Sequence, residues 1–182
     1  MQDLWVFGYG SLMWRPGFEH EDRRPALLRG FHRSFCVYSH VHRGTPEKPG
    51  LVFGLDAGGS CRGVAFRVDA ARAEETKRYL QAREQVTLVY RDVVKRVELV
   101  GGGGAVDALC FVVDRKHQQY AGRLAFDEQV RLIAEGEGRS GRNPDYLEST
   151  VRHLDESGLP DEGLTKLWRA VEQRLHRPPA SP

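Results

Sequence analysis

Cysteine is scarce in this chain, with three residues of that type among 182. Cys36, Cys61 and Cys110 are odd in number and far apart, and none belongs to the C-x-x-C pattern that supplies paired ligands to a zinc ion. We therefore expect free, buried thiols rather than a zinc site.

Long apolar runs are missing as well. No stretch approaches the roughly 20 apolar residues that a membrane-spanning helix needs, and the first residues do not form a basic segment followed by an apolar one. A charge bias is also absent, because 27 basic residues are spread among 25 acidic ones and the net charge is +2. A nucleic-acid-binding face would need lysines and arginines gathered together. We expect a cytoplasmic protein with neither a membrane nor a nucleic acid as its partner.

The length is typical of one domain, since domains cluster at roughly 100–150 residues. We expect a single domain over residues 1–176 and a frayed Pro-rich tail over 177–182. The first two-thirds is rich in strand-like segments, at 5–7, 31–39, 51–56, 63–68, 86–100 and 106–114. Several of them alternate apolar and polar residues, which predicts strands with one wet face. This favours a mixed or antiparallel sheet that can close into a barrel.

Helical segments dominate the last third, and we predict helices over 121–135, 144–156 and 164–175. Asn143 is placed to cap the second of these, with Pro144 at the first helical position. The four-glycine run Gly101–Gly104 joins two strand-like segments. A phosphate-binding loop would be followed by a helix, so we interpret the run as a hairpin connection.

An earlier helix is predicted over residues 70–84, with Asp69 accepting hydrogen bonds from its first turn. Ala73, Thr76, Leu80 and Glu84 are spaced 3, 4 and 4 residues apart, so they share one face. That face carries the core, and Glu84 therefore points toward it. A carboxylate there either pairs with an arginine such as Arg83 or Arg91, or rises in pKa and becomes suited to general acid–base catalysis.

The sequence VFGYGSLMW, Val6 to Trp14, is an apolar strand that breaks into Gly-Tyr-Gly-Ser. Two glycines at the end of a buried strand let the backbone approach a ligand closely, with amides available for a carboxylate or an oxyanion. Ser11 lies outside any G-x-S-x-G elbow and has no assignable Asp-His pair, so we expect it to donate through its amide. The third glycine and the helix of a dinucleotide fingerprint are missing, which excludes NAD.

Two other polar segments carry residues that could bind a ligand. His40 and His42 are two residues apart, but Gly44, Pro46 and Gly50 make this stretch a loop without a third ligand, so no metal is expected. The loop Gly138–Pro144 precedes a helix start and is either an anion-facing element or a plain capped turn.

Four motifs in order then resemble the ChaC family of γ-glutamylcyclotransferases: Val6–Trp14, His42–Gly50 (HRGTPEKPG), Tyr79–Glu84 (YLQARE) and Ser140–Leu147 (SGRNPDYL). The resemblance implies an α+β, γ-glutamylcyclotransferase-like fold, in which a mixed β-barrel is flanked by helices in a single domain. It implies a carbon–nitrogen lyase that acts on glutathione and releases 5-oxoproline and cysteinylglycine, with no metal or organic cofactor.

Carried over residue by residue, Tyr9, Gly10, Ser11 and Leu12 match the family's substrate-binding loop, and Glu84 matches its catalytic glutamate. Tyr146 and the loop before it match another family motif. By the same resemblance, Arg33 or Arg43 is a candidate to meet a substrate carboxylate, because a guanidinium suits that task. Gln85-Val-Thr follows Glu84 where some relatives have a glycine-rich insertion.

The reaction implied by the resemblance uses Glu84 first as base and then as acid. Two alternatives remain at this point. The substrate is another γ-glutamyl amino acid or amine, or the chain is a non-catalytic, soluble regulatory binding protein. The sequence leaves the oligomeric state open.

Overall fold

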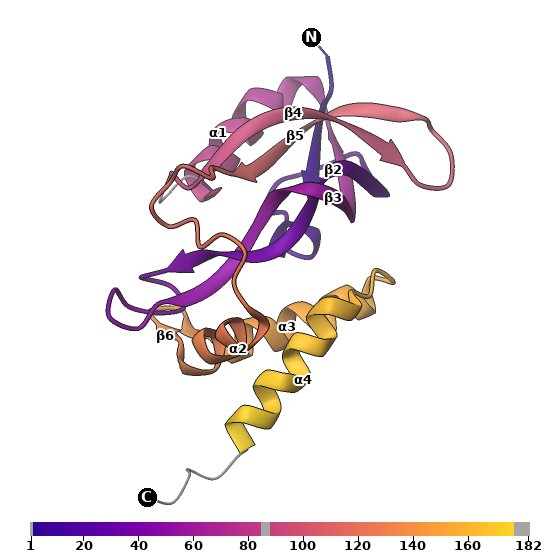
Figure 1. Ribbon diagram of the computed structural model, residues 1–182. Helices are drawn as coiled ribbons and strands as arrows, with labels where there is room; N and C mark the ends of the chain where they lie inside the picture. Colours follow the sequence, from indigo (N-terminus) through magenta and orange to yellow (C-terminus); the bar gives the residue numbers. More distant parts are fainter. Residues whose placement is uncertain (1, 85–87, 177–182) are drawn as a thin grey trace, which may run out of the picture. The chain divides into compact units, whose positions relative to one another are not determined.

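The computed structural model describes residues 2–84 and 88–176 (Figure 1). Contacts divide the chain into two compact units, one made of the chain up to Ser34 with Phe53–Tyr120, the other of Phe35–Val52 with the chain from Ala121 onward. Two long strands, β2 (Asp22–Ser39) and β3 (Gly50–Val68), have residues in both units. The domain boundary predicted at residue 176 stays a prediction, and the predicted tail over 177–182 lies outside the described residues.

Five strands, β2 and β3 among them, close into a barrel in the order β1-β3-β2-β4-β5. The remaining three are β1 (Leu4–Gly8), β4 (Tyr90–Leu99) and β5 (Ala105–Val113). The β1 strand pairs antiparallel with β3 and parallel with β5, while β4 pairs antiparallel with both β2 and β5. The barrel is therefore mixed. The predicted α+β class with a mixed barrel and helices is confirmed.

Several strands are longer than their sequence patterns indicate. The β2 strand begins at Asp22 rather than Phe31, and β3 continues through Ala57–Arg62, which separates two of the predicted strands. This middle portion is almost entirely exposed, so it lacks the apolar signal, yet backbone hydrogen bonds between neighbouring strands do not need apolar side chains. The predicted start of the next strand at Val86 lies outside the described residues, and β4 as described begins at Tyr90.

The four-glycine run forms the predicted connection between β4 and β5. All four glycines have positive φ, from 72° to 105°, and the Leu99 amide donates to the Gly104 carbonyl at 2.9 Å. Residues with a Cβ rarely adopt such angles, which explains the composition of this turn.

Helix α1 (Ala73–Glu84) follows a 3₁₀ turn, η2 (Ala70–Arg72), and the Gln81 side chain near its end donates to the Asp92 carboxylate of β4 at 3.1 Å. The Asp69 carboxylate accepts a hydrogen bond from the Ala71 amide at 2.8 Å, so the predicted cap is confirmed. Ala73, Thr76 and Leu80 are buried, which confirms the predicted inner face. Leu80 is fully buried in a unit whose core includes Phe7, Phe66 and Phe111.

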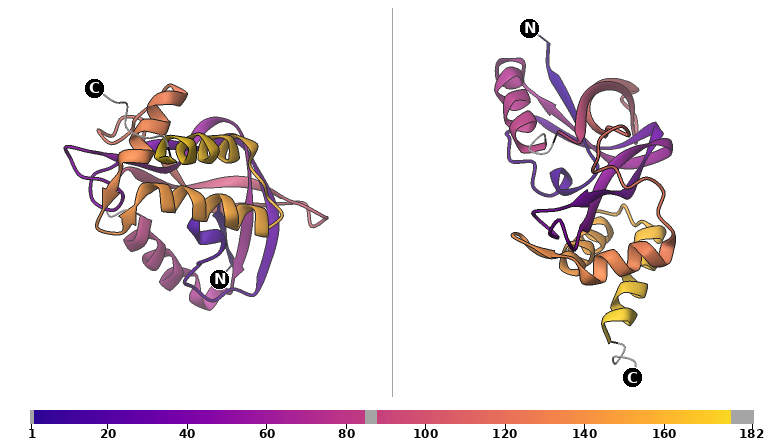
Figure 2. Two further views of the ribbon diagram at one scale, coloured as in Figure 1. Left: turned by 90° about the horizontal axis from the view of Figure 1, so that it is seen from below. Right: turned by 60° about the vertical axis from the view of Figure 1, so that its left-hand side comes forward.

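The second unit holds three helices that pack on one another, α2 (Phe126–Glu135), α3 (Asn143–Glu156) and α4 (Glu162–His176), as Figure 2 shows. Helix α2 begins five residues later than predicted, because the Ala121 amide donates to the Cys36 carbonyl and Gly122 has a positive φ of 68°. A short two-stranded sheet, β6 (Glu137–Gly138) with β7 (Gly141–Arg142), precedes α3. Across the described ranges, none of the helices combines the length and apolar character required to cross a membrane.

The predicted role of Asn143 as a helix cap is wrong. Arg142 occupies the cap position without a side-chain hydrogen bond, and Asn143 is already helical. The fully buried Asn143 carboxamide instead accepts from the Leu51 amide at 2.7 Å and donates to the Leu51 carbonyl at 2.8 Å. It satisfies both backbone groups of a residue 92 positions earlier in the chain, and no local pattern encodes such a pairing.

Candidate active site

The segment 8–12, which we call the Gly-rich loop, begins where β1 ends. It turns directly into a short 3₁₀ helix, η1 (Ser11–Met13). The Met13 amide donates to the Gly10 carbonyl at 2.9 Å, and the Arg15 amide donates to the Ser11 carbonyl at 2.8 Å. The amides of Gly10, Ser11 and Leu12 come first in this turn, and the first amides of a helix have no acceptor inside it. The cap residue, Gly10, has no side chain to accept from them. These amides are therefore suited to an external acceptor.

Side chains of the same loop divide into two groups. Tyr9 is 7% exposed and Leu12 is 5% exposed, so both anchor the loop in the interior. Gly10 and Ser11 are half-buried. The loop can thus contact a ligand through its main chain while its larger side chains hold it in place.

The two glycines of the loop have different surroundings. A Cβ built on Gly8 would lie 3.2 Å from the Leu12 Cβ and 3.3 Å from the Phe66 ring. A Cβ built on Gly10 would meet only the Phe53 ring, at 3.9 Å, which is an ordinary contact. A Cβ at Gly8 would therefore need Leu12 or Phe66 to move by a few tenths of an ångström, whereas Gly10 leaves space for close approach of a ligand.

Glu84 is the last residue of α1, and its side chain is 20% exposed. Burial raises the pKa of this carboxyl group, and the nearby Arg83 guanidinium lowers it by a smaller amount, so the pKa lies above its usual range. The Arg83 Nε lies 3.4 Å from the Glu84 Oε1. The sequence offered two alternatives for Glu84, pairing with an arginine or a raised pKa, and the structure shows both together.

Arg83 also reaches the Gly-rich loop. Its Nη2 donates to the Ser11 Oγ at 3.0 Å, and its Nη1 donates to the Arg15 carbonyl at 2.7 Å. The structure thereby brings two predicted site residues, Ser11 and Glu84, to the same guanidinium. Sequence reasoning considered Arg83 only as an ion-pair partner, because its contacts with residues near position 11 depend on tertiary structure.

Arg33, on β2, holds the other side of this loop. Its Nε donates to the Tyr9 carbonyl at 2.5 Å and its Nη2 to the Arg62 carbonyl at 2.7 Å. These bonds direct two of its nitrogens to the backbone. The contact of Arg33 with a substrate carboxylate stays a prediction.

In the second unit, the structure brings Arg43 and Tyr146 together. The Arg43 guanidinium carbon lies 5.0 Å from the centre of the Tyr146 ring, within the range of a cation–π contact. Its Nη1 donates to the Ser140 carbonyl at 2.6 Å, and the His42 Nδ1 is 2.9 Å from the Ser140 Oγ. Two of the motifs that carried the resemblance, the one beginning at His42 and the one beginning at Ser140, are therefore bonded to each other.

Comparison with known proteins assigns the family. The sequence profile of the ChaC family, described as ChaC-like protein, matches residues 4–174. The chain belongs to the ChaC family. It is 35% identical over 172 residues to the glutathione-specific gamma-glutamylcyclotransferase of Escherichia coli (strain K12), covering 94% of this chain and 74% of that protein. It is 34% identical over 181 residues to the human glutathione-specific gamma-glutamylcyclotransferase 1, covering 96% and 81%.

Solved structures support the same assignment. A yeast gamma-glutamylcyclotransferase specific to glutathione superposes with a TM-score of 0.85 at 25% identity, covering 97% of this chain and 98% of that one. Another protein, described as a gamma-glutamyl cyclotransferase, shares the fold with a TM-score of 0.56 at 16% identity. The γ-glutamylcyclotransferase-like fold implied by the four motifs is confirmed.

The possible metal ligands of this ChaC-family chain do not assemble. His40 stacks against Tyr38, and in the ranges 2–84 and 88–176 no three His, Cys, Asp or Glu side chains are grouped to hold a metal ion. The three cysteines are buried thiols outside any disulfide, as predicted. Burial raises the pKa of the Cys110 thiol to about 12, so it is not a reactive thiolate near neutrality.

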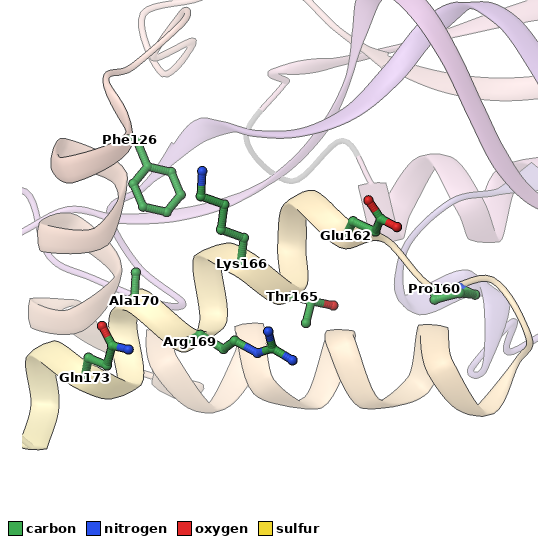
Figure 3. Close-up of a pocket in the computed structure, with 8 residues that line it drawn as sticks. All are labelled: Phe126, Pro160, Glu162, Thr165, Lys166, Arg169, Ala170 and Gln173. Atoms are coloured by element: carbon green, nitrogen blue, oxygen red, sulfur yellow. The ribbon is translucent and has the colours of Figure 1, made fainter.

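One pocket of the structure lies away from the ChaC motifs, and another is lined in part by a motif residue. Figure 3 shows a pocket of about 570 Å³ between the start of α2 and α4, where Lys166 lies 5.2 Å from the centre of the Phe126 ring. Its lining contains none of the predicted site residues. A pocket of about 410 Å³ in the first unit is lined in part by Tyr79, whose hydroxyl accepts a hydrogen bond from Arg83.

Proposed function

We propose that this chain is a glutathione-specific γ-glutamylcyclotransferase, which cyclises the γ-glutamyl group of glutathione and releases 5-oxoproline and cysteinylglycine. One observation carries the proposal: the Glu84 carboxyl, whose pKa burial raises, lies at the same guanidinium as Ser11 of the Gly-rich loop. The substrate follows from relatives that are themselves described as glutathione-specific.

Glu84 serves first as a general base. The α-amine of the γ-glutamyl group loses a proton to the carboxylate and attacks its own γ-carbonyl carbon, forming the C–N bond of a five-membered ring. Glu84 then returns the proton to the departing cysteine amine as the old C–N bond breaks. A carboxyl group with a raised pKa exchanges protons more readily near neutrality than an ordinary one.

The Gly-rich loop supports this ring closure. Tyr9, Gly10, Ser11 and Leu12 form the binding segment, in which main-chain amides meet the γ-glutamyl part and the developing oxyanion. A donor of this kind contributes roughly 3 kcal/mol in comparable sites. Holding the substrate folded adds the advantage of an intramolecular reaction, with effective molarities on the order of 10⁵ M.

In the second unit, taken by itself, Arg43 and Tyr146 are also proposed to contact the substrate, as the family resemblance implies. Support comes from their place in two ChaC motifs and from their mutual contact in the second unit. The chemistry described needs only proton transfer and hydrogen bonding, so the proposal includes no metal and no organic cofactor.

A cytoplasmic location belongs to the same proposal. Glutathione keeps the thiols of that compartment reduced, and the three cysteines of this chain are buried thiols outside any disulfide. The partner of the protein is then its small-molecule substrate, with no nucleic acid and no membrane involved.

The test compares the wild type with Glu84→Gln on glutathione, without added metal, by following 5-oxoproline and cysteinylglycine. We expect equimolar products from the wild type and a loss of roughly 100-fold or more in the variant, since the amide cannot accept the proton. A variant that keeps more than about a tenth of the wild-type rate would remove Glu84 from the mechanism.

The same assay separates the alternatives. If the folded wild type leaves glutathione intact but cyclises γ-glutamyl-alanine, the substrate is another γ-glutamyl compound. If the folded protein turns over neither compound, the remaining alternatives are a further γ-glutamyl substrate, such as a γ-glutamyl amine, and a non-catalytic binding protein.

A further inference from the structure

One guanidinium connects the two halves of the candidate active site. On one side, the Arg83 Nε lies 3.4 Å from the Glu84 Oε1 at the end of α1. On the other side, the Arg83 Nη2 donates to the Ser11 Oγ at 3.0 Å. Because the guanidinium is planar and rigid, the positions of its nitrogens relative to one another are constant. The separation between the carboxylate and the loop hydroxyl is therefore set by a single stiff group.

The same side chain also holds the chain segment that leaves the loop. The Arg83 Nη1 donates to the Arg15 carbonyl at 2.7 Å and to the Pro16 carbonyl at 3.2 Å. These two carbonyls lie two and three residues after the end of η1, so the loop is bonded to α1 at its serine and at its exit. The Arg83 side chain is 25% exposed, and most of it is thus removed from competition with water.

Tyr79 extends this attachment by one helical turn. Its hydroxyl accepts from the Arg83 Nη1 at 3.1 Å. The Tyr79 ring also packs against Gly17, where a built Cβ would lie 2.8 Å from the ring carbon that bears the hydroxyl. Gly17 has a φ of 74°, so both its conformation and its lack of a side chain allow the loop exit to lie against the helix.

A simple ion pair does not account for this arrangement. Among the contacts of Arg83 with described residues, the one with Glu84 is the longest, and the shorter ones go to neutral acceptors near the loop and on Tyr79. A counter-ion would be expected to make its shortest contacts with the carboxylate. The contacts therefore favour a role in holding the loop.

We infer that Arg83 is a positioning residue for the cyclisation, one that sets the Gly-rich loop relative to the Glu84 carboxylate without touching the substrate itself. The inference rests on the proposed function, because it concerns the reaction that Glu84 and the loop carry out. Misplacing reacting groups by about 1 Å costs on the order of 100-fold in rate. Arg83 thus acts on the rate through Ser11 and Glu84.

The first experiment uses Arg83→Lys and, as a matched control, Arg78→Lys on the exposed face of the same helix. Lysine keeps the positive charge but is a point donor that cannot reach these acceptors together. We expect kcat for glutathione to fall about tenfold or more in Arg83→Lys, with KM changed less than about threefold and the melting temperature nearly retained. Arg78→Lys is expected to match the wild type.

Chemical rescue separates positioning from general stability. Added guanidinium at millimolar concentration, far below denaturing levels, is expected to restore part of kcat in Arg83→Ala and to leave Arg78→Ala unchanged. A residue with only a structural role would lower the melting temperature and the amount of folded enzyme, but not kcat per folded molecule.

The single variant Ser11→Ala keeps the inference testable even if the Arg83 variants fold poorly, and a double-mutant cycle extends the test where they fold. Removal of the Ser11 hydroxyl alone is expected to lower kcat, and its effect should not add to that of Arg83→Lys, because the two substitutions break the same hydrogen bond.

Several outcomes would overturn the inference while leaving the proposed function intact. They are an Arg83→Lys enzyme with wild-type kcat, a wild-type kcat for Ser11→Ala, or fully additive effects in the cycle. A wild-type protein that does not cyclise glutathione would instead contradict the proposed function, so the two failures are distinguishable.

Discussion

At Glu84, burial and charge act on the pKa in opposite directions. Burial penalises the carboxylate, the neighbouring Arg83 favours it, and the effect of burial is larger. The distribution of the Arg83 contacts explains this balance, since most of its donors go to the loop and the Tyr79 hydroxyl rather than to Glu84. A residue that positions the loop is therefore only a weak counter-ion, and the acid keeps the raised pKa that proton exchange needs.

The raised pKa of Glu84 has consequences for pH dependence. The base form is lost as the pH falls through this pKa, so we expect kcat/KM to decline on the acid side at a pH above the ordinary range of a glutamate, about 4.3. Stability follows the opposite course. The folded state holds this proton more tightly than the unfolded chain, so the contribution of Glu84 to the free energy of unfolding falls as the pH rises from the unfolded to the folded pKa.

Glu84→Gln removes that ionisation, and we expect it to melt at a higher temperature than the wild type at neutral pH. The difference should shrink in mild acid, where the wild-type carboxyl is protonated. Melting curves of both proteins at several pH values check this expectation. A variant that is less stable than the wild type at neutral pH would show that the Arg83 contact outweighs burial.

At the scale of elements, neighbouring residues between β1 and η1 have different roles: some anchor the loop, and one leaves space for a ligand. The buried side chains of Tyr9 and Leu12 anchor the loop, so truncating either one would disturb packing as well as binding. Gly10 is the position where a ligand's approach can be tested in isolation, because an added methyl group would make only one ordinary contact, with Phe53.

We expect Gly10→Ala to raise KM for glutathione about tenfold or more, because the new methyl group occupies the space through which a ligand reaches the main chain. The melting temperature should change little. Gly8→Ala is the matched control and should show the reverse, a lower melting temperature, since its Cβ would crowd Leu12 and Phe66. Steady-state kinetics and thermal melts of both variants measure the KM and the melting temperature that test this expectation. An unchanged KM in Gly10→Ala would argue against close approach of the substrate at this glycine.

At the scale of the whole molecule, most of the described carboxyl groups with a shifted pKa have a lowered one, so folding favours their charged form. The strongest case by burial is Asp56, which is 6% exposed. Burial raises its pKa, but hydrogen bonds from Arg115, Tyr120 and the Ala57 amide together outweigh burial, and the net pKa is lowered. Asp56 thereby attaches the segment after β5 to β3 within the first unit.

A lowered pKa in the folded state means that stability is present above the unfolded pKa of aspartate, about 3.9, and is lost as the pH falls toward the folded value. We therefore expect the wild type to lose stability in acid, and Asp56→Asn to be less stable at neutral pH but to lose less stability on acidification. Denaturant unfolding across the acid range measures both slopes. Equal slopes in the two proteins would show that Asp56 does not contribute to acid unfolding.

Much of the architecture was accessible from sequence because its signals are local. The capping carboxylate of Asp69, the buried face of α1 and the glycine turn between β4 and β5 each depend on residues close together in the chain, and all three were predicted correctly. Strand limits were less accessible, since the exposed middle of β3 has no apolar signal and its pairing depends on a distant strand. The role of Asn143 was missed for the same reason, because its partner is Leu51.

The candidate site divides in the same way. The sequence by itself determined the residue types, with two glycines ending a buried strand and a carboxyl group on the inner face of a helix, because backbone freedom and helical periodicity are properties of neighbouring residues. Only the tertiary structure decided that Arg83 bonds to both Ser11 and Glu84, and that burial outweighs this charge at the acid. Burial and contacts between residues 72 positions apart arise from folding, and no local pattern contains them.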